Sequence, residues 1–207
     1  MDCILHPTYF PNIAHFTAML SAGKVSFEVC DNFQKQSFRN RTEIYGANGK
    51  LALTVPVTYS QKNRQLYKDV KIANENNWQQ IHFKSLESAY SMSPFFEFYS
   101  DDLKPLFNTN FKYILDLNLM CFDILITLMD LNIDVSPSKT FEKTPKDKID
   151  YRPLVNRNFV PDELTYYTQV FTEKHGFISN LSILDLLFNE GPNTELYLKK
   201  QSLTGHA

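Results

Sequence analysis

Histidine is the side chain best suited to proton transfer near neutral pH, and one histidine, His6, stands where ligands often bind. It follows a short apolar run at 3–5 and precedes Pro7. Proline disfavours helix at the residue before it, so the run is predicted to be a strand that ends in a loop. Open α/β folds bind ligands at such strand ends, and His6 is therefore a candidate general base. A purely structural loop explains the same residues equally well.

The loop after His6 also carries two aromatic residues, Tyr9 and Phe10, which we expect to form part of a ligand cleft. A helix is predicted to begin after Asn12, because apolar residues recur there at spacings of three and four. The N–H groups in its first turn would then offer a site for an anion. His15 lies on the same helix among apolar neighbours and is expected to be structural.

A second group of candidate residues is basic. Lys35, Arg39 and Arg41, which we call the basic cluster, are separated by even intervals. In an extended segment they would share one face, with Asn40 on the other. Adjacent cations repel one another unless an anion lies opposite, and arginine suits phosphate or carboxylate. The cluster therefore predicts a site for a phosphorylated ligand, with pairing to nearby acidic residues such as Asp31 as the alternative.

A third group lies near the end of the chain. His175 and Asp185 would serve as a base and its orienting partner if the fold brought them to the loop of His6, with Asn180 as a binding residue. The alternative is structural, because Asn180, Ser182 and Asp185 have the spacing of residues that cap the start of a helix. Linear spacing leaves both readings open.

These residues depend on elements at the start of the chain. The strand at 3–5 precedes the helix after Asn12, Gly23 ends that helix, and residues 24–30 alternate apolar and polar side chains as a second strand does. Strands joined through a helix pair in parallel. The predicted fold class is therefore α/β, with a Rossmann-like βαβ start and a mostly parallel or mixed sheet.

Helices are expected to form a layer from about 78 to 131. One helix is predicted at 78–90 and another at 111–131. The second contains an aspartate at every seventh residue, so the carboxylates form one stripe on an apolar helix; these residues are Asp116, Asp123 and Asp130. Three charges exclude a membrane span, and we expect a core helix of a soluble protein.

Other local patterns complete the predicted elements. Asn48-Gly49 indicates a hairpin turn before a buried strand at 51–57. The charged, proline-containing residues 143–162 are predicted to be a mobile surface loop. A strand is expected at 166–171 and a last helix after Ser182. We expect the whole chain to form one domain.

Composition narrows the functions open to the protein. The net charge of −2 offers no general attraction for duplex nucleic acid. Three scattered cysteines and the lack of a signal-like N-terminus point to the cytoplasm, and they predict neither disulfides nor a thiolate metal site. Phosphate-binding glycine loops and hydrolase motifs are also missing from the sequence, which identifies no cofactor.

Several blocks of sequence together resemble the WbqC-like protein family. They follow the order of the family, and they are 6–11 with Phe16, 32–33 with 39–41, 54–57, 85–97 and 177–192. The resemblance implies a transferase that decorates a sugar during synthesis of surface polysaccharide of the O-antigen type. Glycyl or acyl transfer to an amino sugar or nucleotide sugar is the reaction it implies.

Within that scheme His6 would be the base, and the basic cluster would hold a phosphorylated sugar or nucleotide, while Tyr9 or Asn40 would donate to the oxyanion. An acyl or aminoacyl donor is implied as a second partner. Two other readings stay open: a non-catalytic binding or assembly protein that holds a nucleotide or sugar phosphate, and a nucleotidyltransferase-like enzyme.

Overall fold

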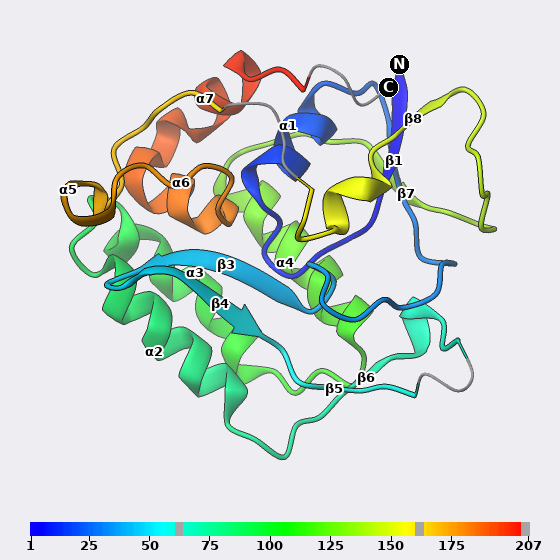
Figure 1. The fold of residues 1–207 in the computed structure, drawn as a ribbon, viewed down its shortest axis with the longest axis horizontal. Helices are drawn as coiled ribbons and strands as arrows, with labels where there is room; N and C mark the ends of the chain where they lie inside the picture. Colours follow the sequence, from blue (N-terminus) through cyan, green and yellow to red (C-terminus); the bar gives the residue numbers. More distant parts are fainter. Residues whose placement is uncertain (61–63, 160–163, 204–207) are drawn as a thin grey trace.

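Four short parallel strands form the central sheet of the computed structural model, which describes residues 1–60, 64–159 and 164–203 (Figure 1). They are β1 (Asp2–Leu5), β2 (Val25–Phe27), β7 (Val135–Pro137) and β8 (Lys148–Asp150), in the order β7-β2-β1-β8. All three pairings are parallel, with Cys3 opposite both Val25 and Ile149. The predicted α/β class with a βαβ start is confirmed.

One face of this sheet is apolar and packs against helices. Leu5 and Phe27 are buried on it. The ring of Phe27 meets Phe122 edge-on at 4.9 Å between centroids, and Phe122 stacks on Phe16 at 6.3 Å. These contacts place the helices of Phe16 and Phe122 over the same face, where they exclude water from the sheet.

The opposite face is polar. Ser26 and Ser136 lie on it, and Lys148 Nζ donates to Ser26 Oγ at 2.8 Å. Residues 137–145 face it across a cavity of about 360 Å³. This asymmetry explains the period-two pattern by which the second strand was predicted.

The first helix, α1 (Ile13–Leu20), begins at Asn12 as predicted. Its first turn has no N–H groups to spare for an anion, because Ala14 donates to Asn180 Oδ1 at 2.9 Å and His15 to Asn12 Oδ1 at 3.0 Å. The prediction of an anion site at this helix start is therefore wrong. Protein side chains occupy the positions that a phosphate would take.

A hairpin and a smaller strand pair lie beside the central sheet. The hairpin strands are β3 (Arg41–Gly46) and β4 (Gly49–Thr54), so the turn predicted at Asn48-Gly49 is confirmed. The strand predicted at 51–57 is divided, because β4 ends before Val55 and Pro56 and the chain continues as β5 (Val57–Thr58), which pairs with β6 (Lys71–Ile72). The prediction that it is buried is wrong, since most residues of β4 are exposed. Proline cannot donate to a ladder, which explains the break. A 3-10 turn, η2 (Tyr67–Asp69), precedes β6.

Three helices make up the predicted helical layer: α2 (Trp78–Tyr90), α3 (Phe96–Asn108) and α4 (Ile114–Leu128). The layer and two of its helices are confirmed, whereas α3 was not predicted, because Pro105 near its end masks the pattern. Asp116 and Asp123 are exposed on α4, as the stripe predicted, whereas Asp130 is exposed but lies beyond the end of the helix, with a positive φ of 52°.

The C-terminal third contains η3 (Arg152–Val155), α5 (Thr172–His175), α6 (Ile183–Glu190), η4 (Gly191–Asn193) and α7 (Thr194–Lys200). The last predicted helix, after Ser182, is confirmed as α6. The strand predicted at 166–171 is not formed.

The prediction of a surface loop at 143–162 is partly wrong. This range contains β8 and η3, and its residues Tyr151, Leu154 and Val155 are buried. Hydrogen bonds to β1 order a segment whose composition is that of a loop. Residues 160–162 of this range lie outside the described residues, and the mobility of the segment stays a prediction.

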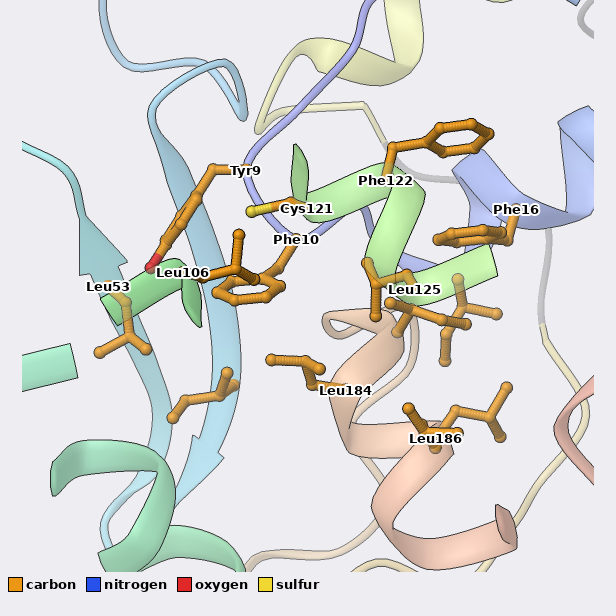
Figure 2. Close-up of a cluster of buried hydrophobic side chains, with 14 of the residues drawn as sticks. Tyr9, Phe10, Phe16, Leu53, Leu106, Cys121, Phe122, Leu125, Leu184 and Leu186 are labelled. Atoms are coloured by element: carbon orange, nitrogen blue, oxygen red, sulfur yellow. The ribbon is translucent and has the colours of Figure 1, made fainter. Parts of the chain in front are cut away.

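Aromatic and aliphatic side chains fill the space between the hairpin, α1, α4 and α6 (Figure 2). Tyr9 and Phe10 belong to this core, each with 1% of its surface exposed. The Tyr9 hydroxyl contacts His82 Nδ1 at 2.9 Å, and the Phe10 ring stacks on Phe107 at 6.0 Å. The two residues therefore stabilise the core and do not form the cleft wall that the sequence predicted.

Candidate functional site

The carboxyl ends of the parallel strands bring polar residues together. His6 follows β1, Glu28 follows β2, Ser138 follows β7, and β8 ends in Asp150 with Arg152 two residues further on. Parallel strands end at the same edge of a sheet, which is where α/β proteins bind ligands. A cavity of about 230 Å³ opens at this edge, and its lining is His6, Asp31, Gln34, Arg39, Phe141, Asp150, Arg152, Pro153, Val155 and Asn156. We call it the carboxyl-end cavity.

Three of these residues form a tight cluster. Arg39 Nη2 lies 3.0 Å from Asp31 Oδ2 and 2.8 Å from His6 Nε2, and His6 Nε2 lies 3.0 Å from the same Asp31 oxygen. Arginine has only donors, so the neutral His6 ring accepts at Nε2 from Arg39 and carries its proton on Nδ1. His6 Nδ1 is buried and has no hydrogen-bond partner among the described residues. A proton arriving at Nε2 would convert the Asp31 contact into a hydrogen bond.

Burial controls the charge of this cluster. It lowers the pKa of His6 to about 4, aided by the nearby charges of Arg39 and Arg152, so His6 is neutral at pH 7. Burial also raises the pKa of Asp31, but contacts with His6, Arg39 and the Asn32 N–H outweigh it and bring the pKa below its ordinary value. The cluster therefore holds one guanidinium, one carboxylate and one uncharged base.

Arg39 is held from several sides. Its side chain is fully buried, its guanidinium lies 5.6 Å from the centre of the Tyr67 ring, and Nη1 donates to Ser37 Oγ at 3.4 Å. Asn118 on α4 donates to its backbone oxygen at 2.6 Å. Arg39 Nε has no hydrogen-bond partner among the described residues. A buried arginine with an unused donor is unusual outside functional sites, because burial of an unpaired polar group is costly.

A second charged pair closes the other side of the cavity. Arg152 Nε donates to Asp150 Oδ1 at 2.8 Å and Nη2 to Oδ2 at 2.6 Å, which is a bidentate pair. Nη1 donates to the Glu142 carbonyl at 2.7 Å and Nη2 to the Lys143 carbonyl at 3.1 Å, while the guanidinium lies 5.3 Å from the centre of the Phe141 ring. Arg152 thus fixes the segment that forms one wall.

Glu28 supplies a third carboxylate behind this wall. Its side chain is fully buried, and Oε1 accepts from the Cys30 N–H and from Ser138 Oγ, each at 2.8 Å. Glu28 Oε2 lies 3.7 Å from Arg152 Nη1. It therefore balances the charge of Arg152 from the protein interior.

The basic cluster does not assemble at this cavity. Lys35 is exposed and lies over the Tyr59 ring at 5.3 Å. Arg41 Nε donates to Thr54 Oγ1 at 2.9 Å on the hairpin, and Asn40 Nδ2 donates to the Val55 carbonyl at 2.8 Å. The segment is not extended, because Gln36 has a positive φ of 58° that interrupts the alternation. Arg39 alone of the cluster reaches the cavity, and it pairs with Asp31.

The C-terminal candidates lie elsewhere. His175 is exposed on α5, and its Nε2 donates to the Ala47 carbonyl at 3.0 Å near the hairpin turn. Asn180 completes the first turn of α1, as described above. Neither residue lines the carboxyl-end cavity.

Asp185 lies in the core. Its carboxylate accepts from Tyr90 at 2.8 Å, Tyr167 at 2.6 Å and Gln169 at 2.9 Å. Burial raises the pKa of Asp185, and these three donors oppose the rise. Ser182 caps α6 as predicted, but Asp185 turns inward and joins α2, α6 and the segment before α5. The arrangement is that of a structural link between elements.

Asp31, Asp150, Arg152 and Glu28 are the site residues that the sequence did not single out as functional. The available signal is position: Asp31 directly follows the strand predicted at 24–30 and Glu28 lies near the end of that range, where the rule that singles out His6 also applies. Asp150 and Arg152 give no such signal, because the sequence around β8 has the charged, proline-containing composition of a loop.

Within residues 1–60, 64–159 and 164–203, no three His, Cys, Asp or Glu side chains converge as a metal site would require. None of the described helices is long and apolar enough to cross a membrane.

The fold and this edge define an α/β protein with a small cavity at the carboxyl end of a parallel sheet. The model of the WbqC-like protein family matches residues 6–155, and the chain belongs to this family. The matched range includes every residue of the cavity lining except Asn156. Comparisons with curated proteins and with solved structures gave no match.

Proposed function

We propose that this protein is a cytoplasmic transferase that moves a glycyl or other acyl group onto the amine of an amino sugar or nucleotide sugar in the synthesis of O-antigen-type surface polysaccharide. The observation that supports it best is His6, an uncharged base in contact with a carboxylate inside a cavity of about 230 Å³. The sugar as acceptor is what the resemblance to the WbqC-like family implies. Such a cavity is smaller than the roughly 300–1,000 Å³ of drug-sized sites, and it suits one end of a sugar ligand.

The chemistry follows from the needs of an amine nucleophile. The acceptor first loses one ammonium proton to solvent, and the free amine nitrogen then attacks the acyl carbon, so that the new C–N bond forms and the bond to the leaving group of the donor breaks. His6 Nε2 takes the proton of the attacking nitrogen in place of its hydrogen bond from Arg39, and Asp31 then accepts from the protonated ring. The proton passes from His6 to the leaving group, which returns the ring to its neutral state.

Other lining residues have supporting roles in this proposal. Gln34 and Asn156 carry amide donors that can bind the oxyanion or the sugar hydroxyls. Tyr9, Asn40, His175 and Asp185 receive no role, because their positions are away from the cavity.

Turnover with a small panel of substrates tests the proposal. Purified protein would be incubated with glucosamine or a nucleotide-linked amino sugar and with acyl or glycyl thioesters, and the products followed by mass spectrometry. We expect a mass increase equal to the acyl group, lost in His6→Asn and kept in the control Arg41→Ala. Full turnover in His6→Asn would refute the base role, and no product with any donor would refute the transferase.

A second function has one observation in its favour. The lone pair of His6 Nε2 already accepts a hydrogen bond from Arg39 and is not free to take a proton. This arrangement fits a protein that binds a ligand without converting it. A sugar ligand that binds and is recovered unchanged would select this binding function.

A further inference from the structure

The arginines of the carboxyl-end cavity lie behind its carboxylates. The side chains of Arg39 and Arg152 are 0% and 9% exposed, whereas those of Asp31 and Asp150 are 14% and 36% exposed. A ligand that enters the cavity therefore meets carboxylate oxygens before it meets guanidinium groups. This order is the reverse of that in a phosphate site.

The guanidinium donors of both arginines are also in use, except Arg39 Nε, which is buried. Arg152 donates to Asp150 and to the carbonyls of Glu142 and Lys143, and Arg39 Nη2 serves both Asp31 and His6. A phosphate would have to displace these charge-assisted bonds, which are among the stronger hydrogen bonds in proteins. The carboxylates keep spare capacity, because each has about four lone-pair positions.

The charge of the site points in the same direction. Its two arginines face three carboxylates, Asp31, Asp150 and Glu28, while His6 is neutral. The group is thus one positive charge short of balance. An added phosphate would increase the excess of negative charge in a partly buried space, and an added ammonium would remove it.

The lining also contains an unsatisfied donor. His6 is 3% exposed, and its Nδ1 has no hydrogen-bond partner among the described residues. Phe141, which is 49% exposed, offers an apolar wall, and Gln34 and Asn156 offer amides. The buried Nδ1 is not accessible to a ligand, whereas the amides and the apolar wall suit the hydroxyls and the carbon face of a sugar ring.

From these observations we infer that the carboxyl-end cavity recognises the ammonium group of an amine-bearing sugar through Asp31 and Asp150, and that it is not a phosphate site. The inference deepens the proposed function and rests on it for the identity of the acceptor. It replaces the phosphorylated ligand that the sequence predicted for the basic cluster. Any phosphate of a nucleotide sugar lies outside this cavity.

Calorimetric titration of the whole protein at pH 6.5 tests the inference without turnover. The probes are glucosamine, its uncharged analogue N-acetylglucosamine, glucose 1-phosphate and glycine. We expect glucosamine to bind at least tenfold more tightly than each of the other three. Equal or tighter binding of N-acetylglucosamine or glucose 1-phosphate would refute the ammonium site. Equal binding of glycine would refute the claim that the amine-bearing ligand is a sugar.

Variants then locate the site. Asp150→Asn removes one negative charge and keeps the shape, and we expect it to weaken glucosamine binding at least fivefold. Asp134→Asn is the matched control. Asp134 is an exposed carboxylate directly before β7, at the amino end of that strand and away from the cavity. Unchanged affinity in Asp150→Asn would place the ammonium elsewhere and refute the assignment. The comparison of probes on the unaltered protein decides the question even if this variant fails to fold.

The two proposals can fail separately. Selective glucosamine binding with no acyl transfer to any acceptor would support the ammonium site and refute the transferase. Acyl transfer by a protein that binds N-acetylglucosamine as well as glucosamine would support the transferase and refute the ammonium site.

Discussion

This protein should lose stability at mildly acid pH, because three histidines are buried in uncharged form. Burial lowers the pKa of His6 to about 4, of His15 to about 3 and of His82 to about 4. His15 Nδ1 donates to Asn12, and His82 meets the hydroxyl of Tyr9. Each ring gains a proton in the unfolded chain at a pH where the folded protein still excludes it.

The sign and size of the effect follow from proton linkage. A histidine whose folded pKa is below its unfolded value of about 6.5 favours unfolding as the pH falls, from about pH 6.5 down to its folded pKa. At pH 5 each of the three costs about 2 kcal/mol relative to pH 7.5, so the sum is about 6 kcal/mol. Typical domains have about 5–15 kcal/mol of total stability. The raised pKa of Asp185 opposes this loss of stability as the pH falls. The lowered pKa of Asp31 adds to the loss at more acid pH.

Urea unfolding at pH 7.5, 6 and 5, followed by circular dichroism, measures this loss. We expect the free energy of unfolding to fall by about 2–3 kcal/mol at pH 6 and by about 6 kcal/mol at pH 5. His82→Gln should reduce the fall at pH 5 by about 2 kcal/mol, whereas the control His175→Asn, which alters an exposed ring, should leave it unchanged. A fall of less than 2 kcal/mol at pH 5 in the unaltered protein would refute the reasoning.

Three further substitutions test other parts of the structure. Asp185→Ala leaves three buried donors without an acceptor and should cost about 3–5 kcal/mol in urea unfolding, so a loss below 1 kcal/mol would contradict the structural link. Gly191→Ala would place its Cβ 2.6 Å from the Phe95 ring at a φ of +53°, and a drop in melting temperature of several degrees is expected, with no drop as the contrary result. Arg152→Met should speed amide hydrogen exchange across 138–147, and unchanged exchange would show that other contacts hold this wall.

Local patterns predicted much of the fold. The βαβ start, the turn at Asn48-Gly49 and the cap at Ser182 each depend on neighbours in sequence, and each is present. β8 could not be predicted in this way, because three residues in a charged segment become a strand only by pairing with β1. Without β8, the sequence did not predict that Asp150 and Arg152 lie at the carboxyl end of the sheet, where they line the cavity.

The candidate site was predicted in the same uneven manner. His6 follows a predicted strand, and Arg39 was found through its charge; both line the cavity. Lys35 and Arg41 are also basic, but they do not line the cavity, because the positive φ of Gln36 interrupts the extended chain. The ion pairs of Arg39 and Arg152 join residues from different elements, which no spacing rule can show.

The first turn of α1 sets a lower limit on the length of chain that can fold. Asn180 Oδ1 and the Leu181 carbonyl accept from the N–H groups of Ala14 and Ile13, at 2.9 and 3.1 Å, although both acceptors lie beyond the family match at 6–155. A fragment cut at the end of that match would leave these groups unpaired and would strip α6 from the core. The range that the family model matches is therefore shorter than the range that pairs the first turn of α1, and residues 180–188 brace this N-terminal helix.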